Sequence, residues 1–287
     1  MAKDGKLYLQ AGKTGFWNVV VEHLDQVQSL KGGPVSITTS DLALAQQFKD
    51  QALQIATGKQ RLVVKRGTPA FSGKIEEDFA RHTLITYDKG DGTRARSALT
   101  FDDTHAYVAW EVQDRTPWIN GAQIDDSLYW GGDTVDFQLG SDPTATPMRT
   151  EAAKGDFRLS IGSLQGKNVA VLFRQIAEQK APRTFSSGVV KEFVVDSVVA
   201  LERARIVVTK RSDGYTVEAA IPLADLGLTL KPGVTLRGDF GVTFGNQAGD
   251  RTRLRSYWSN HNTGIVDDVV YELKLEPQYW GDITIGE

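Results

Sequence analysis

Hydrophobic and polar positions alternate between residues 134 and 139. Val135, Phe137 and Leu139 fall on one face of an extended chain, and the residues between them, including Asp136, fall on the other face. This period of two is typical of a strand with one buried side. We therefore expect one face to pack in a core, which leaves the other face free to form a site.

Similar short patterns follow one another from residue 61 to the end of the chain, with turn residues between them. Asp213-Gly214, between two alternating runs, is a strong signal for a hairpin. Strands at this spacing, without alternating helices, favour an all-β fold, an antiparallel β-sandwich of the jelly-roll-like kind. The predicted strands are residues 61–65, 83–87, 94–101, 106–112, 134–139, 157–161, 169–174, 204–210, 215–221, 237–244 and 271–275.

The first 66 residues differ from the rest of the chain. Strand-like runs at residues 7–10, 17–22 and 34–38 are followed by the one convincing helical pattern, which Ser40 can cap at its N-terminus and Gly58 at its C-terminus. The predicted helix is amphipathic, with an apolar stripe of Leu44, Phe48, Ala52 and Ile55. We divide the chain into an N-terminal segment, residues 1–66, and a sandwich, residues 67–287. The segment either completes the sandwich or is the tail of an upstream domain.

Composition narrows the function classes. The chain has 287 residues, a net charge of −3 and no cysteine. It therefore presents no basic field for nucleic acid, and it has neither disulfides nor thiolate metal sites. No apolar run approaches the roughly 20 residues that span a bilayer, which argues against a membrane partner. The pattern already starts in mid-strand at residues 6–9, without a secretory signal, so we expect a piece of a longer, exported protein, extracellular or periplasmic.

Trp130 and Asp136 suggest a chemistry for the free face of the strand at 134–139. Trp130 follows a polar loop a few residues before the strand, and Asp136 lies on the free face. A flat apolar ring and an acceptor carboxylate could meet at this end of the sheet. Such a pair suits a sugar, which offers an apolar C–H face for stacking and a rim of hydroxyls for polar partners.

Four segments in order resemble the family 9 carbohydrate-binding modules and their DOMON-like relatives. They are Ala-Tyr-Val-Ala-Trp-Glu-Val at 106–112, Trp-Gly-Gly-Asp-Thr-Val-Asp-Phe-Gln-Leu at 130–139, Asp-Phe-Arg at 156–158 and Gly-Tyr-Thr-Val-Glu-Ala-Ala-Ile-Pro at 214–222. The resemblance covers roughly residues 67–287. It implies a non-catalytic β-sandwich that grips a polysaccharide or oligosaccharide between aromatic rings, often beside neighbouring domains of a larger exported enzyme.

The resemblance also implies site residues. Trp130, Asp136 and Arg158 stand where the family has a Trp, an acidic residue on the following strand and an Arg one strand later, with Asp in place of the usual Glu. The further walls of the site are expected at Asn246, Trp258 and Asn262. The chain departs from the family pattern at a polar position that Thr243 occupies.

These residues also allow other interpretations. Asp136 and Arg158 could form a structural ion pair, and Trp110 is expected in the core. No cofactor is required, although Asp88, Asp91, Asp102 and Asp103 could supply oxygen ligands to Ca²⁺. A glycoside hydrolase or lyase domain, a DOMON-like haem-binding redox module with Met148 as axial ligand, and a purely structural docking domain are the alternative functions.

Overall fold

The computed structural model describes residues 6–11, 17–18, 21–23, 35–38, 60–146 and 149–287. It separates into two compact units, residues 1–61 and 62–287. The predicted boundary, between residues 66 and 67, lies slightly later in the chain. No helix among the described residues has the length and apolar character needed to cross a membrane.

The first unit contains a four-stranded sheet, with strand order β2-β1-β4-β3. Its strands fall on the three predicted strand-like runs. Their bounds are Lys6–Ala11 (β1), Trp17–Asn18 (β2), Val21–His23 (β3) and Val35–Thr38 (β4). The predicted amphipathic helix, with Leu44, Phe48, Ala52 and Ile55, lies outside the described residues.

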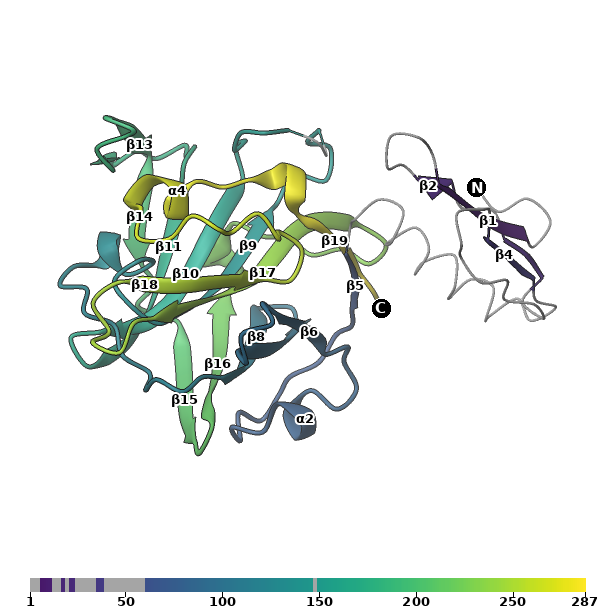
Figure 1. Cartoon of the computed structure of the whole chain (residues 1–287), viewed down its shortest axis with the longest axis horizontal. Helices are drawn as coiled ribbons and strands as arrows, with labels where there is room; N and C mark the ends of the chain where they lie inside the picture. Colours follow the sequence, from purple (N-terminus) through teal and green to yellow (C-terminus); the bar gives the residue numbers. More distant parts are fainter. Residues whose placement is uncertain (1–5, 12–16, 19–20, 24–34, 39–59, 147–148) are drawn as a thin grey trace. The chain divides into compact units, whose positions relative to one another are not determined.

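The second unit is a sandwich of two sheets (Figure 1). The larger sheet has eight strands in the order β14-β11-β10-β9-β17-β19-β5, with β18 also paired to β17. Its strands are Arg61–Val64 (β5), Thr134–Gly140 (β9), Asp156–Leu164 (β10), Lys167–Arg174 (β11), Ser197–Ala200 (β14), Thr235–Gly245 (β17), Thr252–Tyr257 (β18) and Gly281–Ile285 (β19).

The smaller sheet has five strands in the order β15-β16-β8-β7-β6, all antiparallel. They are Ile85–Asp88 (β6), Arg94–Phe101 (β7), His105–Gln113 (β8), Arg205–Arg211 (β15) and Gly214–Pro222 (β16). A separate hairpin joins Arg183–Phe185 (β12) and Phe193–Val195 (β13). The short helices are Ile75–Asp78 (α2), Leu223–Leu226 (α3) and Val269–Leu273 (α4), with single 3₁₀ turns at Asp125–Ser127 (η1) and Pro277–Tyr279 (η2).

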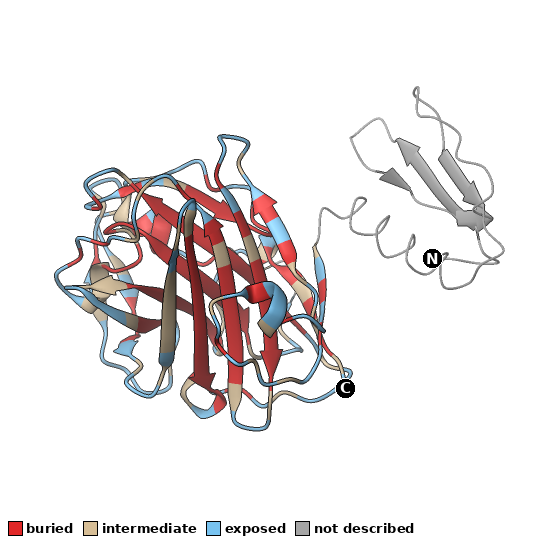
Figure 2. Cartoon of the chain, turned by 90° about the horizontal axis from the view of Figure 1, so that it is seen from below, coloured by how far each residue is buried: buried red, intermediate tan, exposed pale blue. Residues whose placement is uncertain are grey.

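The inner faces of the two sheets form the core. Figure 2 shows in red how much of the strands is buried. Phe240 of β17 lies at its centre, 5.0 Å from Phe137 of β9 and 6.4 Å from Trp110 of β8, measured between ring centroids. Trp110 belongs to the smaller sheet, so these rings join the two layers. The predicted all-β sandwich is confirmed, and so is the prediction that Trp110 lies in the core.

The hairpin predicted at Asp213-Gly214 joins β15 to β16. Gly214 has a φ of +151°, and a Cβ added there would lie 1.9 Å from the carbonyl oxygen of Val112. Glycine is required at this position because any other residue would collide with the neighbouring strand β8.

One predicted strand is wrong. Residues 271–275 were expected to be extended, but Val269–Leu273 forms the helix α4. Asp268 causes the difference, because its carboxylate accepts hydrogen bonds from the backbone N–H groups of Val270 (3.0 Å) and Tyr271 (2.9 Å) and so caps the first helical turn. This short helix matters for the site described below.

The segment that contains α2 packs on the outer face of the smaller sheet. Phe71, Ile75 and Phe79 form an apolar cluster there. Beneath it lies Glu218 of β16, which is fully buried and accepts a hydrogen bond from the N–H of Gly73 (2.7 Å). The half-buried Asp78 carboxyl of α2 is close enough to act on the Glu218 carboxyl electrostatically.

Burial and, after it, the neighbouring Asp78 carboxyl together raise the pKa of Glu218 from its ordinary value of 4.5 to about 7. A raised folded-state pKa adds stability that is complete below the unfolded pKa and is lost as pH rises through the folded pKa. We expect the free energy of unfolding of the wild type to fall relative to Glu218→Gln between about pH 4.5 and 7. Chemical denaturation of both proteins at several pH values measures this difference. If the free energies of unfolding of the two proteins changed with pH in parallel, the raised pKa of Glu218 would be contradicted.

Candidate functional site

Polar side chains form a row across the outer face of the larger sheet. Ser160 of β10 pairs in register with Asp136 of β9, Asp136 pairs with Gly241 of β17, and Gly241 pairs with Tyr257 of β18. Asp136 thus lies on the face opposite to the core, as the alternation in its strand predicts. One of its oxygens accepts a hydrogen bond from Ser160 (2.6 Å) and the other accepts one from the Tyr257 hydroxyl (2.6 Å).

Gly241 makes the contact between Tyr257 and Asp136 feasible. A Cβ added at Gly241 would lie 2.4 Å from ring carbons of Tyr257. The phenol ring can therefore lie across β17 and reach Asp136 only because residue 241 has no side chain. Burial raises the pKa of Tyr257, so its hydroxyl stays protonated and donates to the carboxylate.

Arg158 completes this network. Its guanidinium donates from Nη2 (2.6 Å) and Nε (3.1 Å) to the two oxygens of Asp136, which is a two-point ion pair. Arg158 is 1% exposed and Asp136 is 0% exposed. Burial opposes the positive charge, but Asp136 outweighs it and raises the pKa of Arg158. The guanidinium carbon also lies 5.1 Å from the ring centroid of Tyr129, a cation–π contact.

Helix α4 covers this face of the sheet. Arg158 donates to the carbonyl oxygen of Glu272, and the Tyr129 hydroxyl donates to that of Val269 (2.6 Å). Figure 1 shows α4 lying over the strands of the larger sheet. Val270 and Leu273 fix α4 against the sheet, because both are buried in a second apolar cluster that also contains Tyr129. The Asp136–Arg158 pair is therefore closed off from solvent in this structure.

A second row of polar groups lies one step along the same face. Thr134 of β9 pairs with Thr243 of β17, which pairs with Arg255 of β18. All three are buried, and Thr134 Oγ1, Thr243 Oγ1 and Arg255 Nε have no hydrogen-bond partner among the described residues. Oε2 of Glu272, on α4, also lacks a partner there, and burial raises the pKa of Glu272. The face beneath α4 thus holds unused hydrogen-bonding groups, which are costly in a protein interior.

Trp130 lies near this face, in the loop before β9. Its side chain is half-buried and packs against the cluster that contains Tyr129 and α4. Its carbonyl oxygen accepts a hydrogen bond from Thr252 of β18 (3.2 Å). The loop can approach so closely because Gly132 has a φ of +146°, and a Cβ there would lie 2.6 Å from the carbonyl oxygen of Ile119. Trp130 is thus only partly covered by its neighbours.

The structure places the other three predicted site residues differently. Asn246 is half-buried in the turn from β17 to β18, where its side chain exchanges hydrogen bonds with Asp250, close to the Trp130 loop. Trp258 is 4% exposed and packs edge-on against Phe240 in the core, so it presents no wall to a ligand in this structure. Asn262 is exposed, and no contact among the described residues joins it to Trp130 or to the outer face.

Sequence reasoning missed several residues of this network. Ser160 and Thr134 lie two positions from Arg158 and Asp136, so the period of two could have placed them on the same face. The same alternation, counted from Arg255, points Tyr257 outward and Trp258 inward. The strand pattern at residues 271–275 carries no signal that places Glu272 over this face.

The four aspartates considered for Ca²⁺ are engaged with turns or with arginines. Asp102 accepts hydrogen bonds from Thr104, and Asp103 pairs with Arg66. Asp88 and Asp91 accept from backbone N–H groups two residues on. In the part of the chain that the structure describes, no group of three or more acidic, His or Cys side chains is arranged to hold a metal ion. Met148, considered for haem, lies outside the described residues.

Comparison with solved structures adds to this geometry. A family 9 carbohydrate-binding module from Caldicellulosiruptor kristjanssonii, in complex with cellotriose, has a TM-score of 0.51 and 18% identity over 79% of this chain and 94% of its own. A structure of a family 9 module from the same organism with glucose has a TM-score of 0.51 and 17% identity, over 79% and 97% of the two chains. No protein-family model and no curated protein matches the sequence.

The chain has a family 9-like fold. The resemblance expected from its sequence is confirmed at the level of the β-sandwich, whereas the DOMON-like part of that expectation stays a prediction. At these identities the likeness concerns the fold, so the role of each residue has to be argued from the contacts of this chain.

The buried ion pair yields a prediction about stability. We expect Asp136→Leu to lower the free energy of unfolding by about 3–5 kcal/mol, because Arg158 keeps a buried charge without its partner. The double variant Asp136→Leu/Arg158→Met removes both charges and should recover most of that loss. Denaturant unfolding of the three proteins measures both effects. An Asp136→Leu protein as stable as the wild type would show that the pair does not stabilise the sheet face.

Proposed function

We propose that this chain is a non-catalytic carbohydrate-binding module that binds an oligosaccharide or polysaccharide. Its sugar-binding surface consists of Trp130 and the outer face of the larger sheet around Asp136 and Arg158. The family 9-like fold supports this proposal, since the two similar structures were solved with cellotriose and glucose. The half-buried Trp130 ring supplies a stacking surface beside that face.

The unused polar atoms beneath α4 are the observation that carries the proposal. Thr134 Oγ1, Thr243 Oγ1 and Arg255 Nε on the sheet, and Glu272 Oε2 on α4 itself, are single atoms that have no hydrogen-bond partner among the described residues. A pyranose has several hydroxyls, each of which can donate and accept a hydrogen bond. Sugar hydroxyls would therefore satisfy these groups, whereas an apolar ligand would leave them unpaired.

The sugar and α4 compete for the same face. The hydrogen bond from Arg158 to the Glu272 carbonyl, and that from Tyr129 to Val269, would be exchanged for bonds to sugar hydroxyls. The helix has only five residues, so its own hydrogen bonds stabilise it weakly. Exposure of Val270 and Leu273 opposes opening by about 1.5–3 kcal/mol for each side chain. The apparent affinity is lowered by the small fraction of open molecules.

The surroundings of the module are also part of the proposal. We place it in a larger, exported carbohydrate-active protein, next to other domains, with the N-terminal unit as the connection to them. We propose that binding needs no Ca²⁺, since the carboxylates of Asp88, Asp91, Asp102 and Asp103 each already accept hydrogen bonds or pair with an arginine. Binding measurements with Ca²⁺ and with a chelator should then agree.

The test is a binding screen of the chain against plant and algal polysaccharides and their oligosaccharides, by affinity gel and calorimetry. We expect Trp130→Ala to weaken the binding found there at least about tenfold, because the stacking surface is lost, while the unfolding midpoint changes little. Trp118→Ala is the matched control, since Trp118 is also half-buried but packs on Tyr215 in the smaller sheet.

If Trp130→Ala and Trp118→Ala lowered the affinity for the sugar equally, the proposed stacking role would be contradicted, because the loss of affinity would not be specific to Trp130. Unfolding of the Trp130→Ala protein would assign this ring to the core. Absence of binding across the whole panel would overturn the carbohydrate-binding function.

A further inference from the structure

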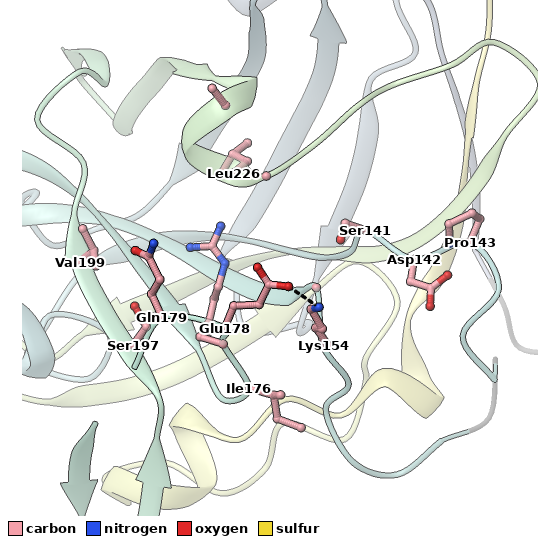
Figure 3. Close-up of a pocket in the computed structure, with 15 residues that line it drawn as sticks. Ser141, Asp142, Pro143, Lys154, Ile176, Glu178, Gln179, Ser197, Val199 and Leu226 are labelled. Carbon is pink, nitrogen blue, oxygen red and sulfur yellow. Dashed lines mark hydrogen bonds and ion pairs between the residues drawn. The ribbon is translucent and has the colours of Figure 1, made fainter. Parts of the chain in front are cut away.

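A groove lies on another part of the sandwich, away from the sheet face around Asp136. It has a volume of about 810 Å³ and forms where the β9–β10 loop, the end of β11, strand β14 and helix α3 meet (Figure 3). Lys154 and Glu178 face each other across it and form an exposed ion pair, drawn as a dashed line in Figure 3. Val199, Gln179 and Ser197 lie together on the other side of the picture.

Among the charged residues that line this groove, only Lys154 and Glu178 form an ion pair within the part of the chain that the structure describes. Lys154 is neutralised by Glu178, and Asp142 accepts hydrogen bonds from the backbone N–H (2.8 Å) and the hydroxyl (2.7 Å) of Thr144. Arg174, at the end of β11, is half-buried and has no acidic partner within ion-pair distance among the described residues.

The backbone of α3 holds the Arg174 side chain in position. Its Nη2 donates to the carbonyl oxygen of Asp225 (3.0 Å), which is its one hydrogen bond among the described residues. The Asp225 carboxylate is taken by another arginine, Arg203, and so does not neutralise Arg174. A guanidinium has five N–H donors, and most of those on Arg174 remain free for a ligand.

The electrostatics of Arg174 agree with this geometry. Burial lowers the pKa of the Arg174 guanidinium, and the charge of Asp225 compensates only in part. An anion in the groove would remove this disadvantage, because a guanidinium and a carboxylate form two parallel hydrogen bonds.

The other lining residues indicate what the anion is attached to. Ser197 of β14 pairs in register with Arg174 of β11. Gln179, a few residues after Arg174 in the sequence, lines the same groove, so the groove also offers a hydroxyl and an amide. Ile176 and Val199 add an apolar wall and are 42% and 47% exposed. A ligand that fits has a carboxylate, several hydroxyls and an apolar C–H face.

We propose that this groove is a second binding site, which takes a carboxylate-bearing sugar, a uronic acid residue of an acidic polysaccharide. Arg174 binds the carboxylate, Gln179 and Ser197 bind hydroxyls, and Ile176 and Val199 contact the ring face. The site is independent of the face around Trp130, so one chain can hold neutral and acidic glycans at two places.

Trigalacturonic acid is the probe, and calorimetry at low ionic strength is the measurement. We expect saturable binding that Arg174→Gln weakens about tenfold or more, because a charge-assisted contact is lost. Arg66→Gln is the matched control, since that arginine is exposed, pairs with Asp103 and does not line the groove, and it should bind like the wild type. Trp130→Ala should also bind like the wild type, which separates this site from the one proposed above.

Three results would overturn the proposal. The Arg174→Gln protein, folded as judged by its unfolding midpoint, could bind the acid as tightly as the wild type. Cellotriose could compete with trigalacturonic acid at equal concentration, which would remove the role of the carboxylate. Sodium acetate could compete equally well, which would show that the groove takes a simple anion and not a sugar acid.

Discussion

The buried pair of Asp136 and Arg158 constrains the outer face of the larger sheet. Two charges removed from water are tolerated only when they are paired and their remaining hydrogen-bonding groups are satisfied. Ser160 and Tyr257 supply two of these partners, and the carbonyl oxygen of Glu272 supplies a third. The sheet therefore needs a polar second layer on this side, and α4 with its flanking loops provides it.

This arrangement makes the sandwich asymmetric. Its inner faces are mainly apolar around Phe240, although Trp110 Nε1 and the Tyr215 hydroxyl lack partners there among the described residues. The face beneath α4 combines a satisfied ion pair with the unpaired atoms Thr134 Oγ1, Thr243 Oγ1 and Arg255 Nε. A polar network that is only partly satisfied costs free energy, unlike an apolar layer of the same size. A hydroxyl-rich ligand could remove that cost by pairing with these atoms. The unpaired atoms in the structure with α4 in place would then favour the binding of a sugar.

The sequence could predict the strands and the placement of Asp136 and Arg158 on one face, because both follow from local alternation. It could not predict how they are covered. Arg158 meets Glu272 across 114 positions of sequence, and no local pattern records such a contact. The apolar run from Val269 to Leu273 resembles a strand until the capping role of Asp268 is known. Burial of Trp258 likewise depends on Phe240, a partner on the neighbouring strand.

The most direct test of the account is the affinity of a Leu273→Ala variant for an oligosaccharide that the wild type binds, measured by calorimetry. Leu273 lies on α4, is 1% exposed and packs in the second apolar cluster, so its truncation weakens the cover while the sheet face stays unchanged. If the sugar and α4 compete, the variant binds about tenfold more tightly or better, since a larger fraction of molecules is open. An unchanged or weaker affinity would contradict the competition and place the sugar elsewhere on the molecule.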